Sequence, residues 1–382
     1  MREFQRNPIT LEGLEDANEH TYEVLDSIML WSFNVCAKGK WPSCNHEGRP
    51  FTSKDGYRYD NRGLPFAGGL HGALSQILGD WKWEVECLGL PQNYKKNDMC
   101  HDCYCTKNGP LSYKDLREDN PGFLMRRTNE EWQAAVDGKI GILKDKPLHK
   151  SMVKRDFMHV SPLGILPEAC GPTLEELCNE NVFGDVTHSC AWKEVMGMQL
   201  KVASQEYKEW CGAQCIKHSG RKFSVKRLSK KNKGDRPILK AKARECLHIA
   251  QWLFTKCKKD NDHQRNRWLC FWGHDELYKI LKTGSQFLTD TECVHMKRAM
   301  RAILISTRAL RAEASASGTK RWHITPKHHA LLEMITEAVR AKLNPAYHWC
   351  WADEDIVGRL SRVAKRCHGR TMARSALKRW AL

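Results

Sequence analysis

Hydrophobic residues recur at intervals of three and four along much of the second half of the chain. This spacing places them on one face of an α-helix. Three stripes carry the pattern: Leu247, Ala250, Leu253, Phe254 and Cys257; Met296, Met300, Ile303, Leu304, Thr307 and Leu310; and Leu331, Leu332, Ile335, Val339 and Leu343. We expect each stripe to be the core-facing side of a helix.

Weaker patterns in the first half predict further elements. Residues 19–37 form a helix-like apolar segment, and Thr128 stands where it would cap a helix over residues 129–136. Another helix is expected to begin at Thr173, directly after Pro172. An apolar segment ending at Gly79 and Asp80 fits either a helix or a strand. Residues 39–72 are rich in Gly, Pro, Asn and Asp, which predicts loops and tight turns.

These elements predict an α-rich α/β chain with four segments. Residues 1–69 are expected to form an N-terminal helix and loop region, and residues 70–170 a core part that carries a Cys/His loop. Residues 171–318 are expected to be a helical insertion with a basic stretch. Residues 319–382 would form a helical C-terminal part that closes the core.

The positive charge of the chain indicates a polyanionic partner. The 382 residues include 62 Lys and Arg against 45 Asp and Glu, a formal charge of +17, which attracts polyanions. Two runs concentrate the excess, one from Lys217 to Arg244 and one after Ile356. The candidate phosphate contacts in them are Lys222, Lys226, Arg227, Lys230, Lys231, Lys233, Arg359, Arg362, Lys365 and Arg366. A basic run can also be only a solvated face. Two such runs favour DNA as the partner, with RNA left open.

The chain lacks an apolar segment of the roughly 20 residues that span a bilayer, and its N-terminus lacks the apolar region of a signal peptide. We therefore expect a soluble intracellular protein without a membrane partner, and nuclear residence follows from the DNA partner. Its 17 cysteines are then expected to be reduced thiols or metal ligands, not a disulfide framework.

The sharpest local signal is a C-x2-C pair formed by Cys100 and Cys103, with Cys105 and His101 beside it. Two thiolates from one turn can bind the same zinc ion, and a structural site needs two further ligands. The candidates for these are Cys87, His71, His149 and the group Cys36, Cys44 and His46. A pair of reduced, buried thiols is the alternative.

A second signal is a set of acidic residues placed where local structure is expected to end. They are Asp80, Asp156, and the run Asp353, Glu354 and Asp355. Carboxylates distant in sequence can assemble the two-metal site that phosphoryl transfer to nucleic acid uses. The alternative for each is a helix cap or a salt bridge.

The order of these motifs resembles the catalytic region of CACTA-type (tnp2-like) transposases, and more closely a multicopy group of transposon-derived proteins in protist genomes. The motifs are, in order, GDWKW, CHDC, DFMH, a long helical region, KRWHITPKHHALLE and NPAYHWCWADEDIVGRL. They cover most of residues 31–382 as a succession of short matches. The order GD, C-x2-C, D-x-M-H is the specific part.

The resemblance implies an RNase H-like mixed sheet flanked by helices, with DNA cut by two Mg²⁺ ions. It places Asp80, Asp156 and Glu354 in the catalytic positions and His328 or His329 in the PK-x-H segment. We take Cys100, Cys103, Cys105 and His159 as the candidate metal ligands, with zinc as their ion.

The sequence also departs from the family pattern. Leu163 precedes Gly164 where the family often carries an acidic residue. The family has a further catalytic Asp on an apolar strand upstream of Asp80; Asp26 is the candidate, and its neighbours predict a helix. Since an incomplete triad cannot hold two metals, three interpretations stay open: an active transposase-like enzyme, a truncated or inactive descendant, and a non-enzymatic, zinc-supported nucleic-acid-binding protein.

Overall fold

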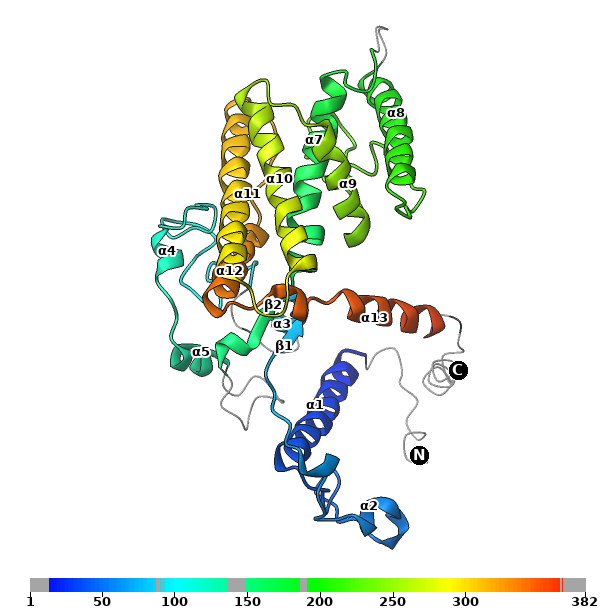
Figure 1. The fold of residues 1–382 in the computed structure, drawn as a ribbon, viewed down its shortest axis with the longest axis vertical. Coiled ribbons are helices and arrows are strands. Elements are labelled where there is room, and N and C mark those ends of the chain that lie inside the picture. Colours follow the sequence, from blue (N-terminus) through cyan, green and yellow to red (C-terminus); the bar gives the residue numbers. More distant parts are fainter. Residues whose placement is uncertain are drawn as a thin grey trace. The chain divides into compact units, whose positions relative to one another are not determined.

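The computed structural model describes residues 14–86, 90, 93–136, 149–185, 191–364 and 366. The chain divides into two compact units. Unit 1 comprises Met1–Asp102 and Arg127–Lys154, and unit 2 comprises Cys103–Arg126 and Arg155–Leu382. Helices predominate (Figure 1), so the expectation of an α-rich chain is confirmed. Among the described residues, no helix combines the length and the apolar character that crossing a membrane requires.

Unit 1 begins with a long helix, includes the loop region and holds the strand pairing. Its elements are α1 (Leu14–Lys38), α2 (Tyr57–Asp60), β1 (Ile77–Gly79), α3 (Trp81–Glu86), α5 (Asn129–Val136) and β2 (Val153–Arg155). Arg155, the last residue of β2, already belongs to unit 2. Strand β1 pairs with β2 in a parallel, two-stranded sheet. Asp26 lies within α1, in agreement with the helical pattern around it. Thr128 caps α5, because its hydroxyl accepts a hydrogen bond from the Glu131 amide at 3.1 Å.

Unit 2 is built mainly from helices (Figure 1). They are α4 (Pro121–Leu124), α6 (Phe157–Val160), α7 (Leu166–Asn179), α8 (Trp192–Ala213), α9 (Ala243–Lys256), α10 (Asp262–Thr283), α11 (Asp290–Ala316), α12 (Pro326–Ala341) and α13 (Trp351–Ala364). The three predicted stripes lie mainly on α9, α11 and α12 and are largely buried. Gly273 permits the close approach of α10 to α11, because a Cβ there would lie 2.6 Å from the carbonyl oxygen of Ala299.

Helix α7 corrects one prediction. It begins at Leu166 and continues through Pro172, whereas the sequence predicts a helix start at Thr173. A proline inside a helix costs about 3 kcal/mol. Apolar residues on both sides of Pro172, among them Cys170 and Leu174, lie in the main hydrophobic cluster of unit 2. Their burial offsets the proline, so the helix does not break.

Three glutamates on α7 and Glu180, the residue at its C-terminal cap, anchor much of unit 2 through ion pairs. Their partners are Arg236 for Glu168, Lys230 and Arg321 for Glu175, His263 and Arg267 for Glu176, and Arg267 for Glu180. Glu175, Glu176 and the whole of Arg267 are buried. The indole Nε1–H of Trp322 also donates to Glu176 at 2.8 Å. These carboxylates therefore tie α7 to segments distant in the sequence.

His263 gives this network a pH dependence. Its ring nitrogens lie 3.2 Å from a Glu176 oxygen and 2.6 Å from a Glu313 oxygen. The hydrogen bond to Glu176 is the main cause that raises the pKa of His263 from its usual 6.5 to about 9. The folded state therefore binds the His263 proton more tightly than the unfolded state does. The contribution of protonated His263 to the free energy of unfolding is complete below pH 6.5 and is lost as the pH rises through about 9.

We predict that His263→Gln lowers the free energy of unfolding most below pH 6.5, and that its difference from the wild type narrows as the pH rises to about 9. Urea unfolding across this pH range measures the difference. Gln264→Ala, which alters a non-titrating neighbour at the start of α10, is the control. A difference that stays constant or widens with rising pH would contradict the assignment.

Candidate metal centre

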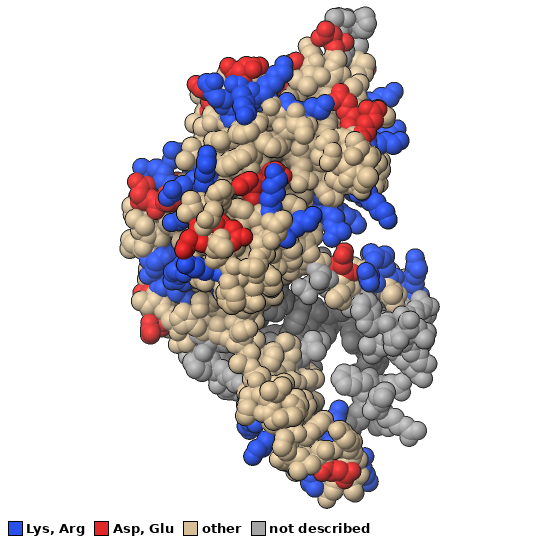
Figure 2. Space-filling model, viewed as in Figure 1, with Lys and Arg blue, Asp and Glu red and all other residues tan. Residues whose placement is uncertain are grey.

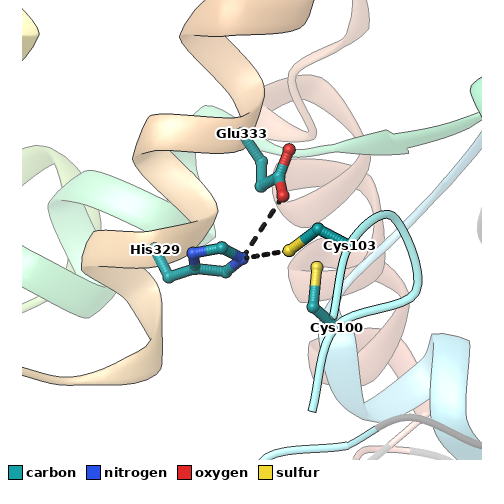
Figure 3. Close-up of side chains that lie close together, drawn as sticks. All are labelled: Cys100, Cys103, His329 and Glu333. Atoms are coloured by element: carbon teal, nitrogen blue, oxygen red, sulfur yellow. Dashed lines mark hydrogen bonds and ion pairs between the residues drawn. The ribbon is translucent and has the colours of Figure 1, made fainter. Parts of the chain in front are cut away.

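Four buried side chains offer metal-ligating atoms within 4.8 Å of one another. They are Cys100, Cys103, His329 and Glu333 (Figure 3). Cys103, His329 and Glu333 belong to unit 2, and the chain itself ties Cys100 to Cys103 through two intervening residues. We refer to these four residues as the Cys-His-Glu cluster.

Two local features bring these side chains together. His329 and Glu333 are four residues apart on α12, so they project from the same face of the helix. Thr325 fixes the start of α12, where its side chain and backbone amide contact His328 Nδ1. The C-x2-C turn presents both sulfurs toward that face, as Figure 3 shows.

Two of the spacings within the cluster match those of a tetrahedral zinc site. His329 Nε2 lies 3.4 Å from Cys103 Sγ and 3.3 Å from Glu333 Oε1. Zinc bound at its usual distances to sulfur, nitrogen and oxygen sets ligand atoms about 3.3–3.8 Å apart. The chemistry also fits, because two thiols, an imidazole and a carboxylate are all zinc ligands. The cluster can therefore hold a metal ion.

Neighbouring groups hold Glu333 and His329 in place. Arg126 Nη1 donates to both Glu333 oxygens at 2.7 and 2.6 Å. The Phe123 ring meets the His329 ring edge-on with centroids 6.1 Å apart, and the Arg126 guanidinium lies 4.8 Å from the Phe123 centroid. Arg126 therefore balances the negative charge of Glu333, and Phe123 limits the orientations that the His329 imidazole can adopt.

Two of the four predicted metal ligands lie in the cluster, and two do not. Cys105 is fully buried but lies outside the group, although it is two residues from Cys103. His159 donates from Nδ1 to Asp156 at 2.7 Å, which makes it part of a helix cap. The further candidates His71, His149, Cys36, Cys44 and His46 also lie outside the group, and Cys87 is not among the described residues.

Glu333 is the member of the cluster that the sequence interpretation misses. The PK-x-H segment points to His329, but only as one of two adjacent histidines with no assigned ion. The i, i+4 spacing of His329 and Glu333 in a predicted helix is the available signal. It is weak by itself, because such pairs occur on many solvated helices.

Asp156 occupies a structural position. Its Oδ2 accepts from the His159 amide at 2.9 Å and caps α6, and its Oδ1 accepts from the Cys350 amide at 2.8 Å. Burial opposes ionisation of Asp156, but these hydrogen bonds outweigh it and lower its pKa. Both oxygens are therefore engaged within the fold.

The other two predicted catalytic acids occupy different settings. Asp80 is the first residue after β1, as Asp156 is after β2. Glu354 lies on α13, and its side chain is outside the described part of the chain. Neither Asp80 nor Asp156 belongs to the metal-capable group found among the described residues.

The basic run from Lys217 to Arg244 is partly internal, which corrects two predicted phosphate contacts. Arg227 is buried and pairs with Glu245 at 2.9 Å. The Lys230 ammonium is buried against Glu175 and donates to the carbonyl oxygens of Lys233 and Asp235, both at 2.7 Å. The other described members are exposed: Lys222, Lys226, Lys231, Lys233, Arg359, Arg362 and Arg366. Lys365 lies outside the described residues.

No protein-family model, curated protein or solved structure matches this chain. The features that bear on function are therefore the cluster, the placement of the acids and the surface charge.

We predict that Asp156→Ala lowers the free energy of unfolding by about 3 kcal/mol, because α6 loses its cap and the buried Cys350 amide loses its acceptor. Chemical denaturation measures the loss. Asp119→Ala is the matched control, since the Asp119 side chain is 75% exposed and lies 3.7 Å from an exposed partner, Arg117. Equal stability of the two variants would show that the Asp156 hydrogen bonds do not support the fold.

Proposed function

We propose that this chain is a zinc-organised, nucleic-acid-binding protein. The observation that carries the proposal is the buried Cys-His-Glu cluster, whose four ligand atoms lie within 4.8 Å. In this proposal zinc binds Cys100, Cys103, His329 and Glu333 and fixes the C-x2-C loop on α12. The loop and the helix are more than two hundred residues apart in the sequence, so one ion would order two distant segments.

The donor set favours a structural role for the zinc. Four protein ligands complete a tetrahedron and leave no open position for water or substrate, as in structural sites. Two thiolates and one carboxylate exceed the charge of Zn²⁺ by one, and Arg126 at 2.6 Å from Glu333 compensates. Removal of the ion would leave two thiols, an imidazole and a carboxylate buried without their shared partner, so the metal would stabilise the fold.

The nucleic-acid partner is supported by charge. The formal charge of +17 is a property of the whole chain, and several of its cations are exposed rather than buried in internal ion pairs. Over the helical part of unit 2, Figure 2 shows Lys and Arg side chains in groups separated by Asp and Glu. Such a surface contacts phosphates at several points. DNA is the expected form, and nuclear residence would follow from it.

Phosphoryl transfer is the second candidate, and it rests on one observation. Asp80 and Asp156 each directly follow one of two parallel, paired strands, which is how an RNase H-like sheet would present Mg²⁺-binding carboxylates. The resemblance to CACTA-type transposases points the same way. Against it, Asp156 already accepts hydrogen bonds from His159 and Cys350. We therefore favour a transposase-like chain that binds nucleic acid without cutting it.

We predict that the purified protein contains about one equivalent of zinc and that Cys103→Ala or His329→Ala reduces this below about half. Elemental analysis measures the content, and a chelator should lower the melting temperature of the wild type but not of these variants. Cys105→Ala is the matched control, because Cys105 is equally buried in the same loop but lies outside the cluster. Zinc-free wild-type protein, or equal zinc loss in Cys105→Ala, would refute the zinc assignment.

We also predict binding to DNA that weakens steeply with salt, with no Mg²⁺-dependent cleavage. Replacing Lys222, Lys226, Lys231 and Lys233 by Gln should reduce the slope of log affinity against log salt by about 0.9 for each phosphate that is no longer neutralised. Fluorescence anisotropy of a labelled oligonucleotide measures the slope, and a supercoiled plasmid reports nicking.

The control for this charge change replaces four exposed lysines elsewhere by Gln: Lys95, Lys96, Lys107 and Lys114. It should leave the slope nearly unchanged. Absence of DNA and RNA binding at low salt would overturn the proposed function. Nicking that needs Mg²⁺ and disappears in Asp80→Ala would establish the second candidate instead.

A further inference from the structure

Three aromatic rings form a row across the surface where α9 meets α10. Phe254 of α9 lies 5.3 Å from Trp268 of α10, measured between ring centroids. Trp272 follows one turn later on α10, stacked on Trp268 at 6.3 Å with an interplanar angle of 12°. All three side chains are partly exposed. Phe254 borders the main hydrophobic cluster of unit 2, and the two tryptophans continue the row beyond it.

A cation stands beside each tryptophan. The Lys259 ammonium lies 3.5 Å from the Trp268 ring centroid, and the Arg298 guanidinium of α11 lies 5.5 Å from that of Trp272. Lys259 and Arg298 are both exposed. Within the described part of the chain, neither forms an ion pair with a carboxylate, in contrast to the cations that face α7. Their charge is therefore available to an anion from outside.

This combination matches the chemistry of an unpaired polynucleotide strand. Aromatic side chains stack on the faces of successive bases, while basic side chains follow the phosphates. A duplex hides its base faces inside the helix, so rings of this kind distinguish single strands from double strands. Helices α9 and α10 supply the three rings, which fixes them more rigidly than a loop would.

We propose that Phe254, Trp268 and Trp272, with Lys259 and Arg298, form a stacking platform for single-stranded nucleic acid. The proposal rests on the nucleic-acid binding proposed above and adds its location and its preference for unpaired bases. Bases stack on the exposed parts of the tryptophan rings. Lys259 and Arg298 contact phosphates on either side, and the ring of each tryptophan remains adjacent to its cation.

The test compares Trp268→Leu and Trp272→Leu with the wild type. Leucine keeps an apolar side chain and a high helix propensity but removes the flat ring. Each substitution should weaken binding of labelled oligothymidine about tenfold, the effect of losing one stacked base. Affinity for a duplex of the same length should change little. Binding of the single strand should also quench wild-type tryptophan fluorescence, and the double variant should lose most of this quenching.

Trp192→Leu is the matched control. Trp192 on α8 is also partly exposed and also has a lysine beside its ring, with Lys230 at 5.3 Å. Lys230, however, is buried and paired with Glu175, so it cannot contact a phosphate. This variant should bind oligothymidine as the wild type does. Thermal melting checks that all variants are folded.

The outcomes separate this inference from the proposed function. If wild-type protein binds nucleic acid but Trp268→Leu and Trp272→Leu bind the single strand equally well, the platform is refuted and the proposed function stands. An abasic strand that binds as tightly as oligothymidine also refutes the platform. If wild-type protein binds neither strand form, both proposals fall. A parallel titration with oligouridine shows whether the platform prefers DNA or RNA.

Discussion

The carboxylates buried along α7 impose the constraint on which most of unit 2 depends. An unpaired buried charge costs several kcal/mol, so each carboxylate needs a cation close by. Glu175 and Glu176 lie almost wholly inside the fold and cannot rely on water. Their cations come from the segment before α9, from α10 and from the segment before α12, namely Lys230, His263, Arg267 and Arg321. Arg236, also from the segment before α9, pairs with Glu168. The position of α7 therefore determines where these segments lie.

The same constraint divides the positive charge of the chain into two populations. Arg227 and Lys230 neutralise buried carboxylates and hold the loop around residue 230 in shape. Exposed cations such as Lys259 and Arg298 lie over aromatic rings instead. The net charge of the chain does not distinguish buried cations from exposed ones. Only the exposed cations can contact a phosphate. A basic run in the sequence therefore overstates the surface that a polyanion can reach.

The Cys-His-Glu cluster also buries groups that can carry negative charge, and its proposed partner is a metal ion. Two thiols and a carboxylate would repel one another if they ionised in a buried site, and Arg126 offsets only one charge. In the proposed zinc-bound form, a divalent ion would resolve this conflict and would join the C-x2-C loop to α12. Asp156 shows another way to stabilise a buried carboxylate, because two backbone amides and the His159 ring donate hydrogen bonds to its oxygens.

Local periodicity and composition suffice to predict α1, α5, α9, α11 and α12, the cap at Thr128, the cysteine pair and the overall positive charge. Each of these depends on residues close together in the chain. The local signal is misleading at Pro172, where tertiary packing outweighs the expected helix start. Only the three-dimensional packing shows that Glu333 lies in the same metal-capable cluster as Cys103, and that Cys105 and His159 lie outside it. Packing alone also shows that Lys230 is buried in an ion pair. Those facts depend on which segments meet in space, and that meeting is governed by the burial of charge on α7 and of apolar stripes on α9, α11 and α12.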